Sequence, residues 1–232
     1  ALVGAGEELV ICGSGETLNF VERYFSALWP RGKPPVPVAL ARLEAGEAIV
    51  DEDCRVSCFA VRHRGTQSLG FRFDGAPRRH LRSRRLAELG VPAGPLRARL
   101  AEGEPVILED GRRIAPDDVT EPPRAGASLV VVGDCEETAT LVDPVRGADG
   151  LVIEASFLDE DRALAAARGH LTAGDAGRLA AEAGVGRLYL THLSARYDAE
   201  AVVAEAGRVF PRVTAARDFD RARILARSPP NC

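Results

Sequence analysis

The stretch that decides the fold is Leu188-Tyr-Leu-Thr-His-Leu-Ser-Ala-Arg-Tyr197, in which an apolar run typical of a buried strand ends at Thr191-His192. Two apolar runs upstream have the same form, Phe59-Ala-Val-Arg-His63 and Val130-Val-Val-Gly-Asp134. Each run delivers one potential metal ligand at its carboxyl end, where a sheet holds side chains rigidly. The recurrence of this pattern predicts that the three side chains converge on one metal site.

Composition excludes several classes of protein. The 232 residues are 46% hydrophobic and 28% charged, which is typical of a globular domain with an ordinary core. No apolar run approaches the roughly 18 residues of a membrane span, and no secretory leader pattern is present, so we expect a cytoplasmic protein without a membrane partner. Five cysteines without a Cys-x-x-Cys pair favour reduced thiols. Gly13-Ser-Gly-Glu-Thr17 lacks the lysine of a phosphate loop, so we expect no nucleotide cofactor.

Apolar runs alternate with helical patterns along most of the chain. From Ser128 onward we expect strands at residues 129–133, 151–155, 188–191 and 212–216, and helices at residues 159–168, 172–184 and 199–209. Thr172 and Asp175 have the spacing of a capping box. Upstream we expect a strand at residues 8–12, a helix at 17–28, an extended segment at 36–43 and a hairpin of residues 54–61 with 69–73. This alternation is typical of an α/β domain.

Residues 75–111 interrupt the pattern with a segment rich in arginine, proline and glycine. It contains one short helix-like run at residues 81–89, and we expect it to be an excursion from the sheet. Five clustered arginines would form a surface for phosphate groups: Arg78, Arg79, Arg82, Arg84 and Arg85. Such a surface suits double-stranded RNA, whose deep groove hides the base edges. The alternative is a solvated arginine-rich loop. The net charge of −4 does not exclude RNA, because local clustering sets the field.

The residues His63, Asp134 and His192 would form half of a dinuclear zinc site. Asp134 follows a buried strand, where an ionised carboxylate needs a cation or several hydrogen-bond donors. Two zinc ions lower the pKa of a bound water and stabilise the oxygens of a phosphoryl displacement. Taken singly, a histidine at a strand end is more often a surface or core residue. The chain contains no His-x-His or His-x-x-x-His pair that would supply further ligands.

A family resemblance rests on several motifs. They are Phe59-Ala-Val-Arg-His63 with Leu69-Gly-Phe71, Leu89-Gly-Val-Pro-Ala-Gly-Pro95, Leu108-Glu-Asp-Gly-Arg112, Gly133-Asp134, Ile153-Glu-Ala-Ser156, Arg168-Gly-His170 and Thr191-His-Leu-Ser-Ala-Arg-Tyr197. With these motifs the chain closely resembles the ribonuclease Z family, the tRNA 3′-processing endonucleases of the metallo-β-lactamase superfamily, up to about Ile224. The pairing of the Gly-His motif with the Thr-His-x-Ser-x-Arg-Tyr motif is the most specific part.

The resemblance implies a fold and an activity. The fold would be a metallo-β-lactamase αββα sandwich, a four-layer α/β (α+β) arrangement, as a single domain over residues 1–232 with a flexible tRNA-binding arm inserted at residues 75–111. The activity would be that of a zinc-dependent endoribonuclease that removes the 3′ trailer from tRNA precursors with a metal-activated water. Members of the family are typically homodimers with two Zn²⁺ ions per site.

The resemblance also assigns roles to residues at the site. His63 would bind one zinc ion, Asp134 would bridge both ions, and His192 would bind the other. His170 would lie beside the scissile phosphate, where it would stabilise charge or protonate the departing 3′ oxygen. Glu154 would support His170. The alternative for Glu154 is an ordinary ion pair with Arg168, which the sequence leaves open.

Substrate contacts are implied at two further places. Arg196 and Tyr197 would hold the end of the acceptor stem or the shape of the site. Gly94 and Pro95 end the motif Leu89-Gly-Val-Pro-Ala-Gly-Pro95 in the arm. These two residues and the five arginines would contact tRNA.

The sequence departs from the family pattern in one major respect. The family motif His-x-His-x-Asp-His, which supplies the remaining zinc ligands, does not occur in these 232 residues and would lie before Ala1. The chain begins with alanine and contains no methionine, so we expect an N-terminally incomplete ribonuclease Z that binds zinc poorly and is inactive alone. Two alternatives remain open: a small-molecule hydrolase of the same fold, and a truncated, non-catalytic RNA-binding relative.

Overall fold

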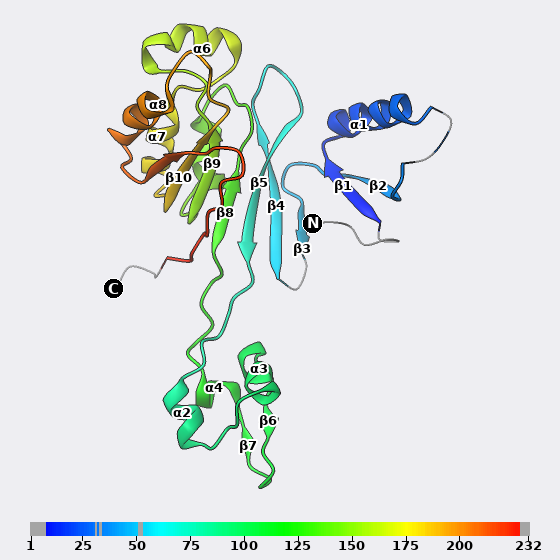
Figure 1. Ribbon diagram of the computed structural model, residues 1–232, viewed down its shortest axis with the longest axis vertical. Coiled ribbons are helices and arrows are strands. Elements are labelled where there is room, and N and C mark those ends of the chain that lie inside the picture. Colours follow the sequence, from blue (N-terminus) through cyan, green and yellow to red (C-terminus); the bar gives the residue numbers. More distant parts are fainter. Residues whose placement is uncertain (1–7, 31, 33, 51–52, 228–232) are drawn as a thin grey trace.

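The computed structural model describes residues 8–30, 32, 34–50 and 53–227, and its centre is a seven-stranded mixed sheet (Figure 1). In spatial order the strands are β11 (Val213–Ala215), β10 (Arg187–Thr191), β9 (Gly150–Glu154), β8 (Ser128–Val131), β5 (Ser68–Gly75), β4 (Cys54–Val61) and β3 (Ala48–Val50). Strands β8 to β11 are parallel, β5 is antiparallel to β8, and β4 is antiparallel to β5. Strand β4 therefore runs in the same direction as β8, β9 and β10. The carboxyl ends of these four strands lie at the same end of the sheet.

Six helical elements accompany the parallel half of the sheet (Figure 1). They are η1 (Ala139–Leu141), α5 (Val142–Val145), η2 (Asp159–Asp161), α6 (Arg162–Arg168), α7 (Ala173–Glu182) and α8 (Ala199–Gly207). Of these, α7 and α8 pack against strands of the sheet. Alternate residues of the strands, such as Leu151, Ile153, Leu188 and Leu190, are completely buried in the core. Burying each of these side chains contributes about 2 kcal/mol. This core fixes the strand ends that carry the candidate site.

The N-terminal part forms a small separate sheet. Strand β1 (Leu9–Gly13) pairs in parallel with β2 (Val38–Arg42), and α1 (Gly15–Leu28) connects them. The side chain of Ser14 caps α1 by accepting a hydrogen bond from the backbone N–H of Thr17. This unit lies beside β3 and β4 in Figure 1 and brings the start of α1 toward the β4–β5 hairpin.

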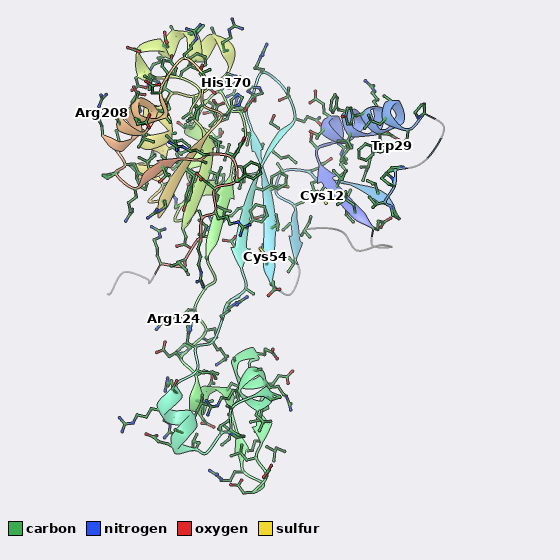
Figure 2. The ribbon with its side chains drawn as sticks, viewed as in Figure 1. Cys12, Trp29, Cys54, Arg124, His170 and Arg208 are labelled. Atoms are coloured by element: carbon green, nitrogen blue, oxygen red, sulfur yellow. The ribbon has the colours of Figure 1, made fainter. Side chains whose placement is uncertain are left out.

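The chain leaves the sheet after Gly75 and returns at Ser128, forming the arm that extends from the sheet in Figure 1. The arm contains α2 (Ser83–Glu88), α3 (Pro95–Glu102), β6 (Val106–Ile107), β7 (Arg113–Ile114) and α4 (Pro116–Val119). Its own core consists of Leu86, Val91, Leu100, Val106, Leu108, Ile114 and Val119. The two segments that join the arm to the sheet form a stalk, in which Arg78 pairs with Arg124 through backbone hydrogen bonds; Figure 2 labels Arg124 there. The excursion therefore continues beyond Gly111, because β7 and α4 are needed to complete this core.

Most expected elements are confirmed, with ends that differ by a few residues. The hairpin of β4 and β5, the strands β8 to β11 and the helices α6 to α8 all occur where the pattern places them. The capping box at α7 is also confirmed: Thr172 accepts from the backbone N–H of Asp175, and Asp175 accepts in return. The short elements α3, β6, β7 and α4 were not expected. In the part of the chain that the structure describes, no helix has the length and apolar character to cross a membrane.

An ion-pair network joins α7 to the turn before α6. Asp175 accepts hydrogen bonds from Arg162 and Arg178, and Asp159 accepts from Arg178 and Thr172. Burial alone would raise the pKa of Asp175, but the hydrogen bonds from Arg178, Arg162 and Thr172 outweigh it and hold that pKa below its ordinary value. The network fixes the α6–α7 connection, which carries His170.

We expect Asp175→Asn to lower the free energy of unfolding by about 2 kcal/mol at neutral pH, because charged hydrogen bonds are lost at a mostly buried side chain. A carboxyl with a lowered folded-state pKa stabilises the fold above its unfolded pKa and loses this effect as the pH falls through the folded value. The difference between the wild type and the variant should therefore shrink in acid. Urea unfolding across pH measures it.

Asp143→Asn is the matched control for this experiment. Asp143 pairs with Arg146 while its side chain is 88% exposed, so its replacement should change stability very little. Equal losses for the two variants at neutral pH, or a loss for Asp175→Asn that persists in acid, would contradict this account of the network.

Candidate functional site

Four strand ends bring the candidate residues together. His63 follows β4 by two residues, Asp134 follows β8 by three, Glu154 ends β9, and His192 follows β10 directly. Because these strands run in one direction, all four residues lie at the same end of the sheet, where the strands finish. His170 joins them from the α6–α7 connection, and Figure 2 shows it beside the ends of the strands.

The side chains of this group lie close to one another. His192 Nε2 is 3.6 Å from Asp134 Oδ1. The ring of His170 neighbours both other imidazoles, with its centroid 5.5 Å from that of His63 and 5.2 Å from that of His192. Asp134, His170 and His192 offer ligand atoms that all lie within 4.8 Å of one another. The residues that the sequence singled out therefore converge. His170 lies close to Asp134 and His192 as well as to His63.

Glu154 is the buried partner of His170. Its side chain has no exposed surface, and Oε1 accepts hydrogen bonds from His170 Nδ1 at 2.9 Å and from the backbone N–H of Cys135 at 2.8 Å. Oε2 accepts from Ser156 Oγ at 2.8 Å. These donors replace the water that a buried carboxylate loses. The alternative of a surface ion pair between Glu154 and Arg168 is therefore wrong, because the carboxylate lies inside and Arg168 is exposed.

The hydrogen bonds also define which nitrogen of each imidazole carries a proton. Nδ1 of His170 faces the Glu154 carboxylate, and Nδ1 of His63 lies 3.0 Å from the carbonyl oxygen of Gly169. Both partners act as acceptors, so each Nδ1 donates its hydrogen and leaves an Nε2 lone pair. This is the tautomer of a metal-binding histidine whose other nitrogen is held by an acceptor.

Ser156 is a site residue whose role the sequence analysis missed. Its hydroxyl lies between Glu154 Oε2 and the backbone carbonyl oxygen of His192, at 2.8 and 2.9 Å. His192 has a φ of 52°, a left-handed conformation that costs a residue with a side chain roughly 1 kcal/mol. The spacing of two residues from Glu154 in an extended segment could have indicated Ser156, because such side chains lie on the same side.

Cys135 lies next to Asp134 but is completely buried. Burial, reinforced by the nearby carboxylates of Glu154 and Asp134, raises the pKa of the Cys135 thiol far above its ordinary value. The side chain packs in the main core.

Arg196 and Tyr197 occupy the loop after His192. The hydroxyl of Tyr197 donates a hydrogen bond to the Asp161 carboxylate, which ties the loop to the turn before α6. Arg196 is exposed. Tyr197 therefore has a structural partner, whereas Arg196 points its charge toward solvent near the site.

The arginines of the arm are largely paired. Arg79 binds Asp117, both Arg84 and Arg85 bind Glu88, and Arg78 lies 3.6 Å from Asp53, whereas Arg82 has no ion-pair partner among the described residues. Most of these pairs are exposed and contribute little to stability, so phosphate could replace the carboxylates. These carboxylate partners make the arginine-rich surface of the arm less positively charged than the sequence of arginines alone indicates.

Gly94 and Pro95 form the exposed turn between α2 and α3. Gly94 has φ 117° and ψ −149°, a conformation that glycine alone adopts readily. Pro95 then starts α3, where its missing N–H is not needed.

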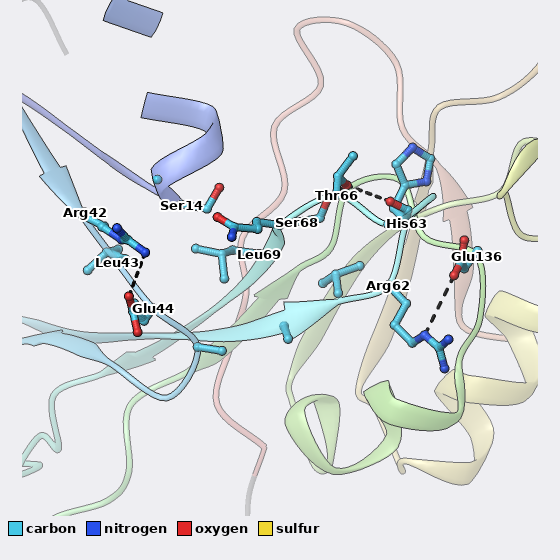
Figure 3. A pocket seen from close by; sticks show the side chains of 16 residues that line it. Ser14, Arg42, Leu43, Glu44, Arg62, His63, Thr66, Ser68, Leu69 and Glu136 are labelled. Atoms are coloured by element: carbon cyan, nitrogen blue, oxygen red, sulfur yellow. Dashed lines mark hydrogen bonds and ion pairs between the residues drawn. The ribbon is translucent and has the colours of Figure 1, made fainter. Parts of the chain in front are cut away.

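A cavity of about 650 Å³ opens beside His63, between the start of α1 and the β4–β5 hairpin (Figure 3). Its polar lining includes Ser14, Arg42, Glu44, Arg62, Thr66 and Glu136. Thr66 donates a hydrogen bond to the backbone carbonyl of His63 at 2.7 Å, which holds the histidine at the cavity mouth. Charged groups of both signs, from arginine and glutamate side chains in the cavity wall, therefore lie next to His63.

The chain is similar to known proteins in sequence and in fold. A ribonuclease Z of Bradyrhizobium diazoefficiens is 49% identical over 216 residues, which cover 93% of this chain and 72% of the relative. A crystal structure of the metallo-β-lactamase fold protein YhfI from Bacillus subtilis matches with a TM-score of 0.59 at 18% identity, over 93% of this chain and 65% of that one. Human tRNase Z, short form, matches with a TM-score of 0.56 at 20% identity, over 94% and 68%.

No family model matches the chain. The two structural matches establish the metallo-β-lactamase fold, and the identity to a ribonuclease Z across most of both chains establishes the family. This chain therefore belongs to the ribonuclease Z family.

Proposed function

We propose that this chain carries the catalytic machinery of a zinc-dependent endoribonuclease that cleaves the 3′ trailer from tRNA precursors. The observation that supports it most is the convergence of His63, Asp134, His170 and His192 around the buried Glu154, in a chain of the ribonuclease Z family. The proposed setting is the cytoplasm, where tRNA precursors mature, without a membrane or a nucleotide cofactor.

The donor set fits Zn²⁺. Two imidazoles and a carboxylate, from His63, His192 and Asp134, are ligands that zinc prefers, and the hydrogen bond at His63 Nδ1 leaves its Nε2 free to bind. Bound zinc would supply an activated water and neutralise charge on the phosphate. We assign these three residues as zinc ligands, with Asp134 positioned to use both carboxylate oxygens.

His170 would act on the leaving group. Its Nδ1 is held by Glu154, so its Nε2 is left to carry a proton to the departing 3′ oxygen. Glu154 would stabilise the protonated imidazole and fix its orientation. Ser156 would hold Glu154 and the backbone of His192 at a fixed distance. This fixes the position of His170, which Glu154 binds, relative to the zinc ligand His192.

Substrate binding would involve the loop after β10 and the arm. Arg196 would contact the phosphates of the acceptor-stem end, with Tyr197 holding the loop in place. In the arm, the substrate contacts would be Arg78, Arg79, Arg82, Arg84, Arg85, Gly94 and Pro95. The paired arginines would exchange their carboxylate partners for RNA phosphates. A homodimer would allow the arm of one subunit to serve the site of the other.

The proposed activity is tested by cleavage of a tRNA precursor. We compare the 232-residue chain alone with the same chain joined to the part of the Bradyrhizobium diazoefficiens ribonuclease Z that the match leaves uncovered. We expect the joined protein to release the 3′ trailer and to lose this activity with a chelator, and the chain alone to be inactive. Trailer release that is indifferent to the chelator, or no release by the joined protein, would contradict the proposal.

In the joined protein, Glu154→Gln should lower the single-turnover cleavage rate by roughly 10²-fold or more, because the amide no longer stabilises a protonated His170. Glu182→Gln is the matched control, since Glu182 is exposed on α7. Precursor binding should be similar in both variants. An unchanged cleavage rate in folded Glu154→Gln protein would refute the role given to the Glu154–His170 pair.

Replacing residues 79–123 by a short glycine linker removes the arm while the stalk residues Arg78 and Arg124 remain. Because the arm has its own core, the sheet should stay folded. We expect tRNA binding to fall strongly while hydrolysis of bis(p-nitrophenyl) phosphate by the joined protein persists. Retention of full tRNA affinity would show that the arm does not bind the substrate.

A further inference from the structure

We propose that Gly126 and Asp149 are positioning residues, which fix the direction in which the arm leaves the sheet. The inference rests on the proposed binding of tRNA by the arm and adds the residues that orient the arm. The arm joins the sheet at the carboxyl end of β5 and the amino end of β8, whereas the candidate site lies at the carboxyl end of β8. Figure 2 shows His170 and Arg124 toward opposite ends of the sheet. RNA that the arm holds therefore reaches a site correctly only if the arm has the right direction.

The base of the stalk, residues 74–78 and 124–128, continues two strands of the sheet without a change of register. Asp74 of β5 pairs with Ser128 of β8, and Arg78 pairs with Arg124 in the same antiparallel manner. Each segment has three residues between these two pairs, so the strands stay aligned as they leave the sheet. The arm is therefore attached through an extension of the sheet and not through a free linker.

The two segments of the base touch backbone to backbone at Gly126. A Cβ atom added there would clash with the carbonyl oxygen of Gly75 and lie 2.8 Å from that of Ala76. A Cβ atom added at Gly75 would be less crowded, at 3.3 Å from the carbonyl oxygen of Ala127. Backbone atoms cannot turn aside as the end of a side chain can, so a larger residue at position 126 forces the segments apart. Because the sheet holds one end of each segment, the arm at the other end would change direction.

Asp149 holds the returning segment at Ser128. Its Oδ2 accepts hydrogen bonds from the backbone N–H of Ser128 at 2.8 Å and from the Ser128 hydroxyl at 3.1 Å. Its Oδ1 accepts from the backbone N–H and the Nε of Arg227, at 2.9 and 3.1 Å. The side chain of Asp149 is only 9% exposed, so these charged hydrogen bonds form largely away from water, where they are strong.

The departing segment is held in a similar way at Asp74. Nε of Arg72 donates to the Asp74 carboxylate at 3.0 Å, and Nη1 of Arg72 donates to the carbonyl oxygens of Pro144 and Arg146, both at 3.1 Å. Pro144 lies in α5, and Arg146 begins the turn between α5 and β9, which also contains Asp149. Both points at which the arm joins the sheet are therefore tied to the same region of the molecule.

The arm and the sheet have separate cores. Among the described residues, the core of the arm and the main core have no residue in common. A change at the base of the stalk should therefore turn the arm as a unit and leave both cores and the candidate site intact. A residue that only stabilised the fold would instead affect the site together with the arm.

The joined protein tests this inference through Gly126→Ala. We expect small-angle X-ray scattering to show a changed position of the arm. The KM for a tRNA precursor should rise at least roughly tenfold while kcat changes by less than about twofold, because only binding that depends on the arm is lost. Hydrolysis of bis(p-nitrophenyl) phosphate should remain at the wild-type rate. Gly75→Ala should raise KM by a smaller factor, since its added Cβ meets less crowding.

Asp149→Asn tests the second attachment. It should also change the scattering profile and raise KM, by a smaller factor than Gly126→Ala because the amide keeps one acceptor oxygen. Asp143→Asn is its exposed control. Gly207→Ala is the control for an added methyl group, because its Cβ would make an ordinary contact of 3.7 Å with Val213. Neither control should change the scattering profile or KM.

Circular dichroism establishes that each variant is folded, and Gly75→Ala and Asp149→Asn carry the test if Gly126→Ala is not. A wild-type KM and scattering profile in the folded variants would overturn the inference. Equal losses of precursor cleavage and of small-substrate hydrolysis would also overturn it, because these residues would then only stabilise the fold. If the joined protein cleaves no precursor, the proposed function fails, while scattering still decides whether these residues orient the arm.

Discussion

The carboxylate of Glu154 lies inside the protein at the end of β9 and accepts hydrogen bonds from three segments. These come from His170 in the α6–α7 connection, the backbone of Cys135 after β8, and Ser156, whose hydroxyl also contacts the carbonyl of His192 after β10. One buried charge therefore joins the segments that hold His170, Asp134 and His192. Without those donors the carboxylate would be a large energetic cost in the core, so the site and the local fold stabilise each other.

Strand direction supplies the second constraint. Antiparallel pairing of β4 with β5 and of β5 with β8 returns β4 to the direction of the parallel strands. His63 therefore lies at the same end of the sheet as Asp134 and His192, although the three residues are far apart in sequence. The ion-pair network around Asp175 then fixes the α6–α7 connection, from which His170 comes close to the imidazoles of His63 and His192.

Much of this could be predicted from the sequence, because apolar runs and caps are local signals. The runs before His63, Asp134 and His192 indicated strands, and the capping box at Thr172 located α7 to the residue. The spacing from Glu154 could have indicated the contact of Ser156 with that carboxylate, but not its contact with the His192 carbonyl, which depends on the distance between two strand ends. Nor could the ligand set be ranked, because the proximity of His170 to Asp134 and His192 arises from the packing of a connection between helices.

The arm shows the same limit. Its arginine run indicated a phosphate-binding surface, but the sequence does not say which charges are paired. Glu88 and Asp117 lie against three of those arginines in the structure, because α2 and α4 fold onto a small shared core. The core itself is made of short elements with few apolar residues each, too short for a periodic pattern to reveal.

The central claim is that zinc can be held at the end of this sheet by residues organised around Glu154. Anomalous diffraction at the zinc absorption edge from crystals of the zinc-loaded chain tests it most directly. The account predicts zinc in contact with His63, Asp134 and His192, with Glu154 buried behind His170. A peak bound elsewhere, or a Glu154 side chain turned toward solvent, would contradict it.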